Sequence, residues 1–216
     1  MLVALWSAKG GSGATVVAAA LAAVLARSSP VGAVLVDLAG DGPAVLGVAE
    51  PEGPGVAGWL AAGPTVPPDG LARLEVALGD GLALLACGGA LPEAGDRGEV
   101  LAALLAADAR PVVVDCGSAP TGARLAVAAA ATHSLLVLRP CYLGLRRAIA
   151  SPLRPSGVVL VEEAGRRLGR RDVEDALGVP VRAVVAHDPR IARAVDAGLL
   201  ASRLPTSFER TLRRVA

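Results

Sequence analysis

Short apolar runs alternate along the chain with longer stretches of helical periodicity. The first run, 2–6, stops at the glycine-rich segment 7–13, which leads into an uninterrupted Ala, Val and Leu stretch over 14–27. This order predicts a strand, a loop and a buried helix. Further apolar runs lie at 33–36, 82–86, 111–114, 134–138, 158–161 and 181–185. Helical stretches lie at 55–62, 97–107, 121–131, 143–150, 170–177, 191–198 and 207–215.

The predicted strands do not alternate strictly between apolar and polar residues, which is typical of strands covered on both faces. Strands and helices that follow one another in this way predict an α/β fold with right-handed crossovers. We therefore expect a mainly parallel central sheet of about seven strands with helices on both faces, in three α/β/α layers. Residues 50–69, dense in Gly and Pro, are interpreted as an excursion after the second strand, because the alternation then resumes. Residues 1–216 are expected to form a single domain.

The composition excludes several classes of protein. Hydrophobic residues make up 53% of the chain and charged residues 19%, which excludes global disorder. The longest uncharged apolar stretch near the start, 16–26, is shorter than the roughly 18 to 20 residues of a membrane span, so neither a transmembrane helix nor a signal peptide is expected. The three cysteines are far apart and form no C-x-x-C pair, which argues for a reducing cytoplasm.

Charge is distributed unevenly along the chain. The sequence contains one lysine, Lys9, against 20 arginines, and a lysine kept at one position marks it as a candidate functional residue. The formal net charge is only +1, yet residues 139–216 carry 15 basic and 8 acidic side chains, whereas residues 1–138 carry 6 and 12. The last third is therefore the basic part of the chain.

Polar residues follow three of the predicted strands. They are the segment Lys9 to Thr15, Asp37 and Asp115. Open α/β sheets bind ligands at the carboxyl ends of their strands, so these residues are expected to meet at one edge. The Thr15 hydroxyl is placed for a Mg²⁺ ion that bridges two phosphates, and Asp115 is placed to hold that ion through water. Asp37 is a second acidic group within reach.

The glycines of the loop favour an anion. Gly10, Gly11 and Gly13 let the backbone pass close to a ligand, and the N–H groups of residues 14–17 point at it with the helix dipole behind them. A phosphate is the expected occupant. A ligand-free turn is the plain alternative, and a dinucleotide site is disfavoured because the third glycine of its fingerprint is absent.

The loop also resembles a known family. Lys9-Gly10-Gly11-Ser12-Gly13-Ala14-Thr15 is similar to the deviant Walker A loop of the MinD/ParA ATPases, whose pattern is K-G-G-x-G-K-[TS]. The resemblance continues over 34–37, 112–115, 134–146 and 172–195, which is nearly the full length. Within the family, Gly81-Leu82 and the short segment 37–41 most resemble the CpaE/TadZ branch.

The resemblance implies a P-loop NTPase-like domain that binds ATP or ADP with Mg²⁺ and forms a homodimer across its nucleotide face. It implies nucleotide contacts at Lys9, Gly10, Gly11, Ser12, Gly13, Ala14, Thr15 and Val16. It implies metal contacts at Thr15, Asp37 and Asp115. The catalytic candidates are Lys9, Asp37 and Asp41, with Lys9 reaching the partner's phosphates.

Three departures from the family pattern change the expected activity. The second lysine of the loop is replaced by Ala14, and the second aspartate of the segment 37–41 by Ala39, with Asp41 as its possible substitute. The family's adenine-contacting asparagine is also missing, and Glu162 stands near its place. We therefore expect nucleotide binding with slow or absent hydrolysis of ATP to ADP and phosphate.

Three functions are weighed on this basis. The first is an ATP-dependent dimeric switch that positions a pilus or secretion apparatus or the division site, with a protein of that machinery as partner. The second is a nucleotide-free scaffold. The third is a DNA-partitioning ATPase, for which the relevant residues are Arg166, Arg167, Arg170 and Arg171. A solvated helix start, balanced by neighbouring acidic residues, is the preferred interpretation of these arginines.

The expected location is the cytoplasm, with the inner face of the membrane or a cell pole as the place of recruitment. The stretch 206–215 has an apolar face opposite arginines, a pattern that also occurs in membrane-binding terminal helices. Peripheral membrane contact is disfavoured, because Thr206 and Glu209 predict a capping box that opens a last helix packed on the sheet.

Overall fold

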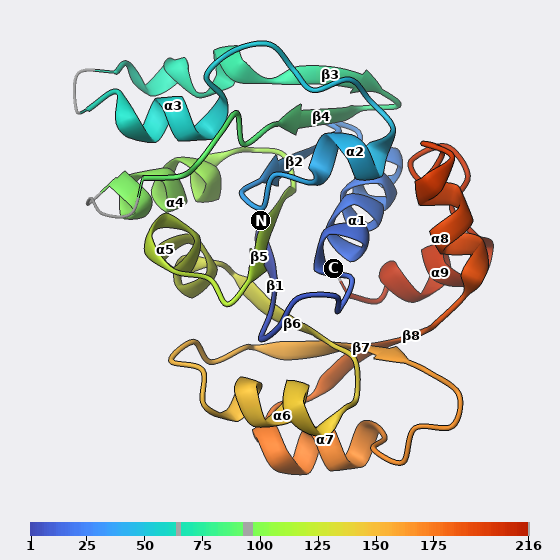
Figure 1. The fold of residues 1–216 in the computed structure, drawn as a ribbon. Helices are drawn as coiled ribbons and strands as arrows, with labels where there is room; N and C mark the ends of the chain where they lie inside the picture. The colour runs from blue at the N-terminus through green and yellow to red at the C-terminus, as the bar shows by residue number, and fades with distance from the viewer. Residues whose placement is uncertain (64–65, 93–96, 216) are drawn as a thin grey trace.

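A single twisted sheet runs through the computed structural model, which describes residues 1–63, 66–92 and 97–215 (Figure 1). The described residues form eight strands in the order β3-β4-β2-β5-β1-β6-β7-β8. All neighbours are parallel except β3 and β4. The strands are β1 (Leu2–Ser7), β2 (Ala33–Asp37), β3 (Val76–Gly79), β4 (Leu82–Leu85), β5 (Val112–Ser118), β6 (His133–Leu138), β7 (Gly157–Glu162) and β8 (Val181–Ala186).

Helices cover both faces of the sheet, which confirms the predicted three-layer arrangement (Figure 1). One face carries α1 (Ala14–Ser28), α2 (Gly42–Leu46), α8 (Pro189–Asp196) and α9 (Thr206–Leu212). The other carries α3 (Gly55–Ala61), α4 (Arg97–Ala107), α5 (Gly122–Ala130), α6 (Tyr142–Ile149) and α7 (Arg170–Leu177). Two short 3₁₀ turns, Pro68–Gly70 and Ala72–Leu74, precede β3. Residues 64 and 65 of the predicted 50–69 excursion lie outside the described residues.

The centre of the sheet is the most deeply buried part of the molecule. Every residue of β1 and of β2 is buried, and β1 lies between β5 and β6. Helix α1 packs over these strands and has no charged residue before Arg27. Its many alanines let the helix backbone lie close to the sheet. The loop between β1 and α1 is therefore fixed at both ends by core elements.

Two elements were not predicted from the sequence. Strand β3 is an edge strand of four residues that are mostly exposed, so it lacks the apolar run that marks the other strands. It forms a hairpin with β4 through Asp80 and Gly81, whose φ angles are 49° and 75°. An Asp-Gly pair is a hairpin signal, and it was the one available clue. Helix α2 has only five residues and begins with Gly-Pro, so it is too short to show a helical periodicity in the sequence.

The last helix packs on the core, as the sequence predicted. Phe208, Leu212 and Val215 are buried in the same cluster as α1. The predicted capping box is wrong, because Pro205 precedes the helix and Glu209 forms an ion pair of 2.8 Å with Arg213 instead. Among the described helices, none combines the length and apolar character needed to cross a bilayer.

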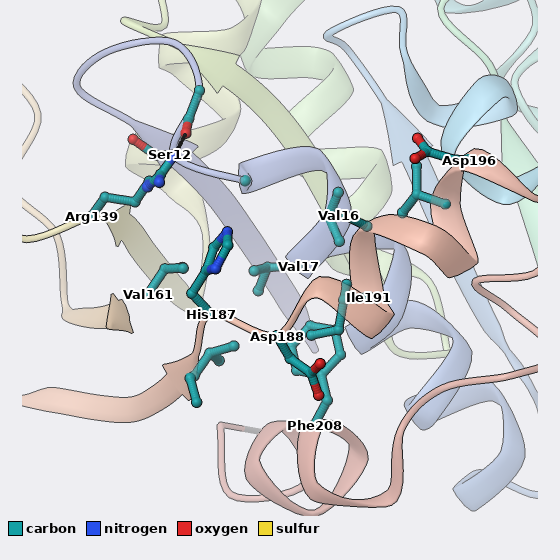
Figure 2. Close-up of a pocket in the computed structure, with 16 residues that line it drawn as sticks. Ser12, Val16, Val17, Arg139, Val161, His187, Asp188, Ile191, Asp196 and Phe208 are labelled. Carbon is teal, nitrogen blue, oxygen red and sulfur yellow. Dashed lines mark hydrogen bonds between the residues drawn. The ribbon is translucent and has the colours of Figure 1, made fainter. Parts of the chain in front are cut away.

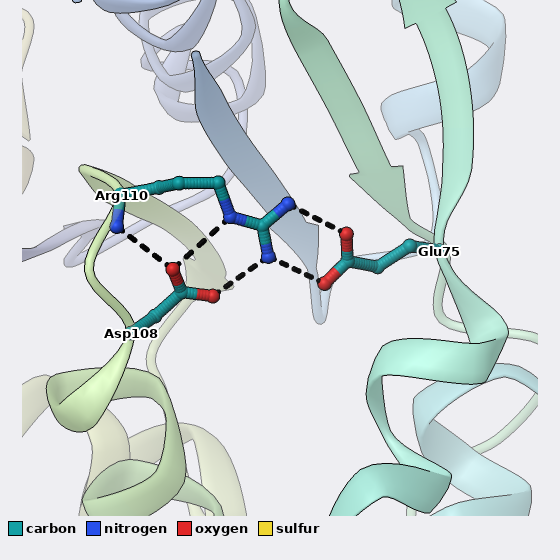
Figure 3. Close-up of polar contacts among 3 residues, drawn as sticks. All are labelled: Glu75, Asp108 and Arg110. Atoms are coloured by element: carbon teal, nitrogen blue, oxygen red, sulfur yellow. Dashed lines mark hydrogen bonds and ion pairs between the residues drawn. The ribbon is translucent and has the colours of Figure 1, made fainter. Parts of the chain in front are cut away.

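An arginine fastens the edge of the sheet to the loop before β5 (Figure 3). The guanidinium of Arg110 donates to both carboxylate oxygens of Glu75, at 2.7 and 2.8 Å, and to both oxygens of Asp108, at 2.7 and 3.0 Å. These three side chains are partly buried, at 27%, 17% and 25% exposure for Arg110, Glu75 and Asp108. The hydrogen bonds with Arg110 lower the pKa of Asp108.

Replacing Arg110 by methionine is expected to lower the free energy of unfolding by about 1.5 kcal/mol at pH 7, since two half-buried carboxylates lose their shared partner. A lowered carboxyl pKa stabilises the folded state above the usual pKa near 4, and this contribution disappears as the pH falls through the lowered folded-state value. Urea unfolding of the wild type and of Arg110→Met should therefore differ at pH 7 and converge in acid. A difference that persists at pH 2 would contradict the electrostatic explanation.

Candidate functional site

The loop between β1 and α1 is held in shape by its own hydroxyl groups. Ser7 Oγ and Ser12 Oγ both donate to the carbonyl oxygen of Lys9, at 2.9 and 3.1 Å. Gly11 and Gly13 have φ angles of 76° and 87°, the left-handed region that favours glycine. The backbone therefore turns sharply and enters α1 at Ala14.

The first turn of α1 presents backbone amides at the mouth of the loop. The N–H groups of Ala14, Thr15 and Val16 lie in the first turn, where the helix offers no carbonyl oxygen to accept from them. They also carry the positive end of the helix dipole. The N–H of Val17 donates to the Gly13 carbonyl at 2.9 Å. The predicted anion-binding amides therefore end at Val16, and the inclusion of residue 17 was wrong.

A cavity of about 680 Å³ opens in front of these amides. Its volume is in the range of small-molecule sites. All predicted loop residues from Gly10 to Val16 line it, together with Ala39, Asp41, Ala44, Val45, Gly117, Ser118, Arg124, Val195 and Asp196. Lys9 is not among the described residues that line this cavity, and its Nζ donates to the Gly10 carbonyl at 3.1 Å.

The buried carboxylate of Asp37 is occupied by its own loop. Its Oδ1 accepts from the N–H groups of Ala39 and Gly40, at 2.9 and 2.8 Å, and its Oδ2 accepts from that of Gly42 at 2.8 Å. The side chain is fully buried. In this structure Asp37 organises the segment 37–42, while its predicted metal and catalytic roles stay predictions. Asp41 is exposed and lines the cavity.

Asp115 lies beside Asp37 in the paired strands β2 and β5, and it is nearly fully buried. Its Oδ1 accepts from the N–H of Gly117 at 2.9 Å, whereas its Oδ2 is buried without a hydrogen-bond partner among the described residues. Burial raises the pKa of Asp115 to about 6, against the lowering effect of the nearby Thr15 hydroxyl and the Gly117 amide. Asp115 and Thr15 are therefore neighbours, as the sequence predicted.

An unsatisfied buried carboxylate oxygen next to a threonine hydroxyl fits a hydrated Mg²⁺ ion. Mg²⁺ prefers oxygen ligands and keeps several waters, and it commonly binds together with substrate phosphates. Among the described residues, no group of three or more His, Cys, Asp or Glu side chains could hold a metal alone. Thr15 and Asp115 would thus hold the ion with phosphate oxygens and water. A bound Mg²⁺ would neutralise phosphate charge.

Two arginines near the loop were missed by sequence reasoning. Arg124, on α5, lines the cavity, and Arg139, after β6, donates from Nη1 to the Gly11 carbonyl at 3.2 Å. Arg139 also forms an ion pair with Glu163. Both arginines belong to segments that lie more than 100 residues from the loop along the chain. Local motifs contain no signal for such contacts.

A second cavity, of about 290 Å³, adjoins the first, since residues 11–13 of the loop line both (Figure 2). Val16, Val17, Val161, Ile191 and Phe208 give it a mostly apolar lining. The imidazole of His187 lies beside the same hollow, near Val17 and Arg139 (Figure 2). An apolar slot next to an amide-lined cavity fits a flat heterocycle attached to a phosphate group.

Glu162, which was predicted near an adenine, is not among the described residues that line the apolar cavity. Its backbone carbonyl accepts from the His187 N–H at 2.8 Å. Glu162 therefore contributes by placing the backbone of His187, and the structure gives its carboxylate no contact with this cavity.

The arginine cluster near α7 is at least partly neutralised. Arg166 forms an ion pair with Glu163 at 2.7 Å, and Arg170 forms one with Glu174 at 3.0 Å. Exposed pairs of this kind contribute little to stability, but they reduce the positive potential of the surface. The contacts support the interpretation of a solvated, charge-balanced helix start.

Comparison with solved structures shows which known proteins share this fold. No protein-family model matches the sequence, and no curated protein matches it either. Solved structures do match over almost the whole chain. A ParA family ATPase from Chlorobium tepidum TLS superposes with a TM-score of 0.74 at 18% identity, over 97% of this chain and 96% of that one.

Two nucleotide complexes are equally similar. The septum site-determining protein MinD from Pyrococcus horikoshii OT3, complexed with Mg-ADP, has a TM-score of 0.73 at 18% identity and covers 100% of this chain and 94% of its own. A complex of a Cyanothece McdA variant with ATP has a TM-score of 0.73 at 19% identity and covers 99% and 94%. The class of fold is therefore that of the MinD and ParA ATPases.

Proposed function

We propose that this chain is a MinD/ParA-like nucleotide-binding protein that dimerises with ATP and Mg²⁺ and positions other cellular machinery. The observation that carries the proposal is the buried Oδ2 of Asp115, which has no hydrogen-bond partner among the described residues. It lies next to Thr15, in the first turn of a helix whose free amides face a cavity. The Mg-ADP and ATP complexes among the similar structures support the choice of ligand.

The two cavities would divide one nucleotide between them. The triphosphate would lie on the amides of residues 10–16, with Mg²⁺ at Thr15 and Asp115, and the base would enter the apolar cavity beside His187 and Phe208. Lys9 would leave the Gly10 carbonyl and reach the phosphates of a second copy. Its partly exposed side chain supports this role, because little packing holds it.

Slow or absent hydrolysis forms part of the proposal. Ala39 lines the cavity at the position where the family pattern that the sequence resembles has an aspartate, and an alanine side chain cannot orient water. Asp41 is exposed at the same cavity, and Asp37 is held by three amides. A long-lived ATP state would suit a protein that marks a position.

We infer the identity of the positioned machinery from the resemblance to the CpaE/TadZ branch. The glycine-leucine pair of Gly81 and Leu82 and the short segment 37–41 support a pilus or secretion apparatus as the recruited partner. Within this proposal the protein acts in the cytoplasm and is recruited to the inner face of the membrane or to a pole.

Sedimentation velocity with ATP, with ADP and without nucleotide, each with Mg²⁺, tests the dimeric switch. The wild type should shift from monomer to dimer with ATP alone. Lys9→Ala should stay monomeric and still bind ATP, because Lys9 serves the partner's phosphates. Arg210→Ala, an exposed arginine on α9, is the control and should dimerise normally. If the wild type neither binds nucleotide nor dimerises, a nucleotide-free scaffold is the function that remains.

A further inference from the structure

Arg124 stands where the nucleotide cavity needs a cation. Among the described residues, Arg124 is the one basic side chain that lines the 680 Å³ cavity, and it is half-buried there. Residue 14, the first of α1, is an alanine, and the Lys9 ammonium is turned toward the Gly10 carbonyl. A triphosphate carries several negative charges, so amides alone leave most of its charge unbalanced.

The position of the Arg124 guanidinium can be fixed from its neighbours. A methyl group built on Gly117 would lie 3.3 Å from Arg124 Nη1 and 3.2 Å from Ala39 Cβ. The guanidinium thus reaches over the loop that follows Asp115 and toward the segment 37–41. Gly117 has a φ angle of 66°, and the absence of a side chain there leaves room for the arginine.

The surroundings leave Arg124 free for an anion. Within residues 1–63, 66–92 and 97–215, neither an ion pair nor a hydrogen bond engages its guanidinium. Its electrostatic influence extends to the Cys87 and Cys116 thiols. Guanidinium groups bind phosphate oxygens through two parallel N–H donors, which suits a site that has lost a single ammonium.

We infer that Arg124 binds the terminal phosphates of the nucleotide within its own chain, in place of the cation that Ala14 cannot supply. This inference rests on the proposed function. The small side chain at position 39 is part of the arrangement, because a carboxylate there would form an ion pair with Arg124. The chain therefore gains a cation from α5, and the side chain at position 39 carries no charge that would pair with it.

Calorimetric titration of the full chain with ATP and Mg²⁺ tests the inference. Arg124→Ala should weaken ATP binding about 10- to 100-fold, and Arg124→Lys should lie between it and the wild type. Affinity for adenosine, which has no phosphate, should not change. Adding Ala14→Lys to Arg124→Ala should restore ATP binding. Arg210→Ala is the matched control, because it removes an exposed helical arginine that lines neither cavity.

A second variant separates this account from a structural role. Ala39→Asp should weaken ATP binding in the wild type, where the new carboxylate neutralises Arg124, and should matter less when Arg124 is already alanine. If the wild type binds ATP and Arg124→Ala binds it with the same affinity, the inference is overturned and the proposed function still stands. A folded wild type that binds no ATP would instead remove the proposed function itself.

Discussion

Alanine in place of Asp37 is expected to lower the free energy of unfolding by about 3 kcal/mol. The variant leaves the N–H groups of Ala39, Gly40 and Gly42 without their acceptor, and that of Gly42 is buried. Buried donors without partners cost about 1–3 kcal/mol each, partly offset here because a buried charge is removed. Urea unfolding at pH 7, followed by circular dichroism, measures the change.

Asp41→Ala is the matched control for this prediction. Asp41 lies in the same segment, is exposed and accepts no side-chain capping hydrogen bond at the start of α2. Its replacement should change the free energy of unfolding by less than about 0.5 kcal/mol. Equal stability of the two variants would show that the Asp37 carboxylate does not hold the segment. Asp37→Asn should fall between them, since its amide group cannot accept from Gly42.

Asparagine in place of Asp115 is expected to stabilise the nucleotide-free protein at pH 7 by about 2 kcal/mol. Burial raises the pKa of Asp115 to about 6, so the folded state retains a proton that the unfolded chain loses near pH 4. The wild type therefore loses stability as the pH rises from about 4 to about 6, and an uncharged amide avoids this loss. Unfolding curves of the wild type and of Asp115→Asn at pH 4 and pH 7 measure the difference in stability at both ends of this pH range.

The same variant should lose the Mg²⁺ dependence of ATP binding, because the Oδ2 that would meet the hydrated ion is replaced by an amide. Asp108→Asn is the control of opposite sign, since Arg110 lowers the pKa of Asp108 and its replacement should destabilise the chain at pH 7. If Asp115→Asn is no more stable than the wild type at pH 7, the raised pKa of Asp115 is not a property of the folded protein.

Residues with local sequence signals were predicted well. Helices α4 and α7 begin and end where the periodicity indicated, at 97–107 and 170–177. The prediction that Thr15 and Asp115 lie together is confirmed, because parallel strands bring their carboxyl ends to one edge. Apolar runs and glycines carried this information within windows of a few residues.

The missed features depend on contacts between distant segments or on exposed residues. Strand β3 is mostly exposed, and its place in the sheet depends on pairing with β4, a contact between neighbouring strands that has no apolar run to signal it. Arg124 lies in a helix that could be predicted, but which cavity its side chain enters depends on how α5 packs against the sheet. The apolar cavity combines residues from the loop between β1 and α1 and from α1, β7, β8, α8 and α9, and their spacing along the chain contains no common pattern.

Asp37 lies where the sequence predicted, but in the structure it accepts hydrogen bonds from its own segment, a role that was not predicted. The sequence placed it at the end of β2 beside Asp115, and the register of β2 and β5 confirms that location. Its three amide partners come from the five residues that follow it. An aspartate followed closely by glycines often accepts hydrogen bonds from its own backbone, and Gly40 and Gly42 give Asp37 this local signal.

A crystal structure of the protein grown with ATP and Mg²⁺ would show whether the loop between β1 and α1 holds a nucleotide. We expect the β- and γ-phosphates on the amides of residues 10–16, with Mg²⁺ on the Thr15 hydroxyl and a water of that ion on Asp115 Oδ2. If the cavity holds no phosphate in crystals grown at millimolar ATP, or if the nucleotide lies elsewhere on the chain, nucleotide binding at this loop is contradicted.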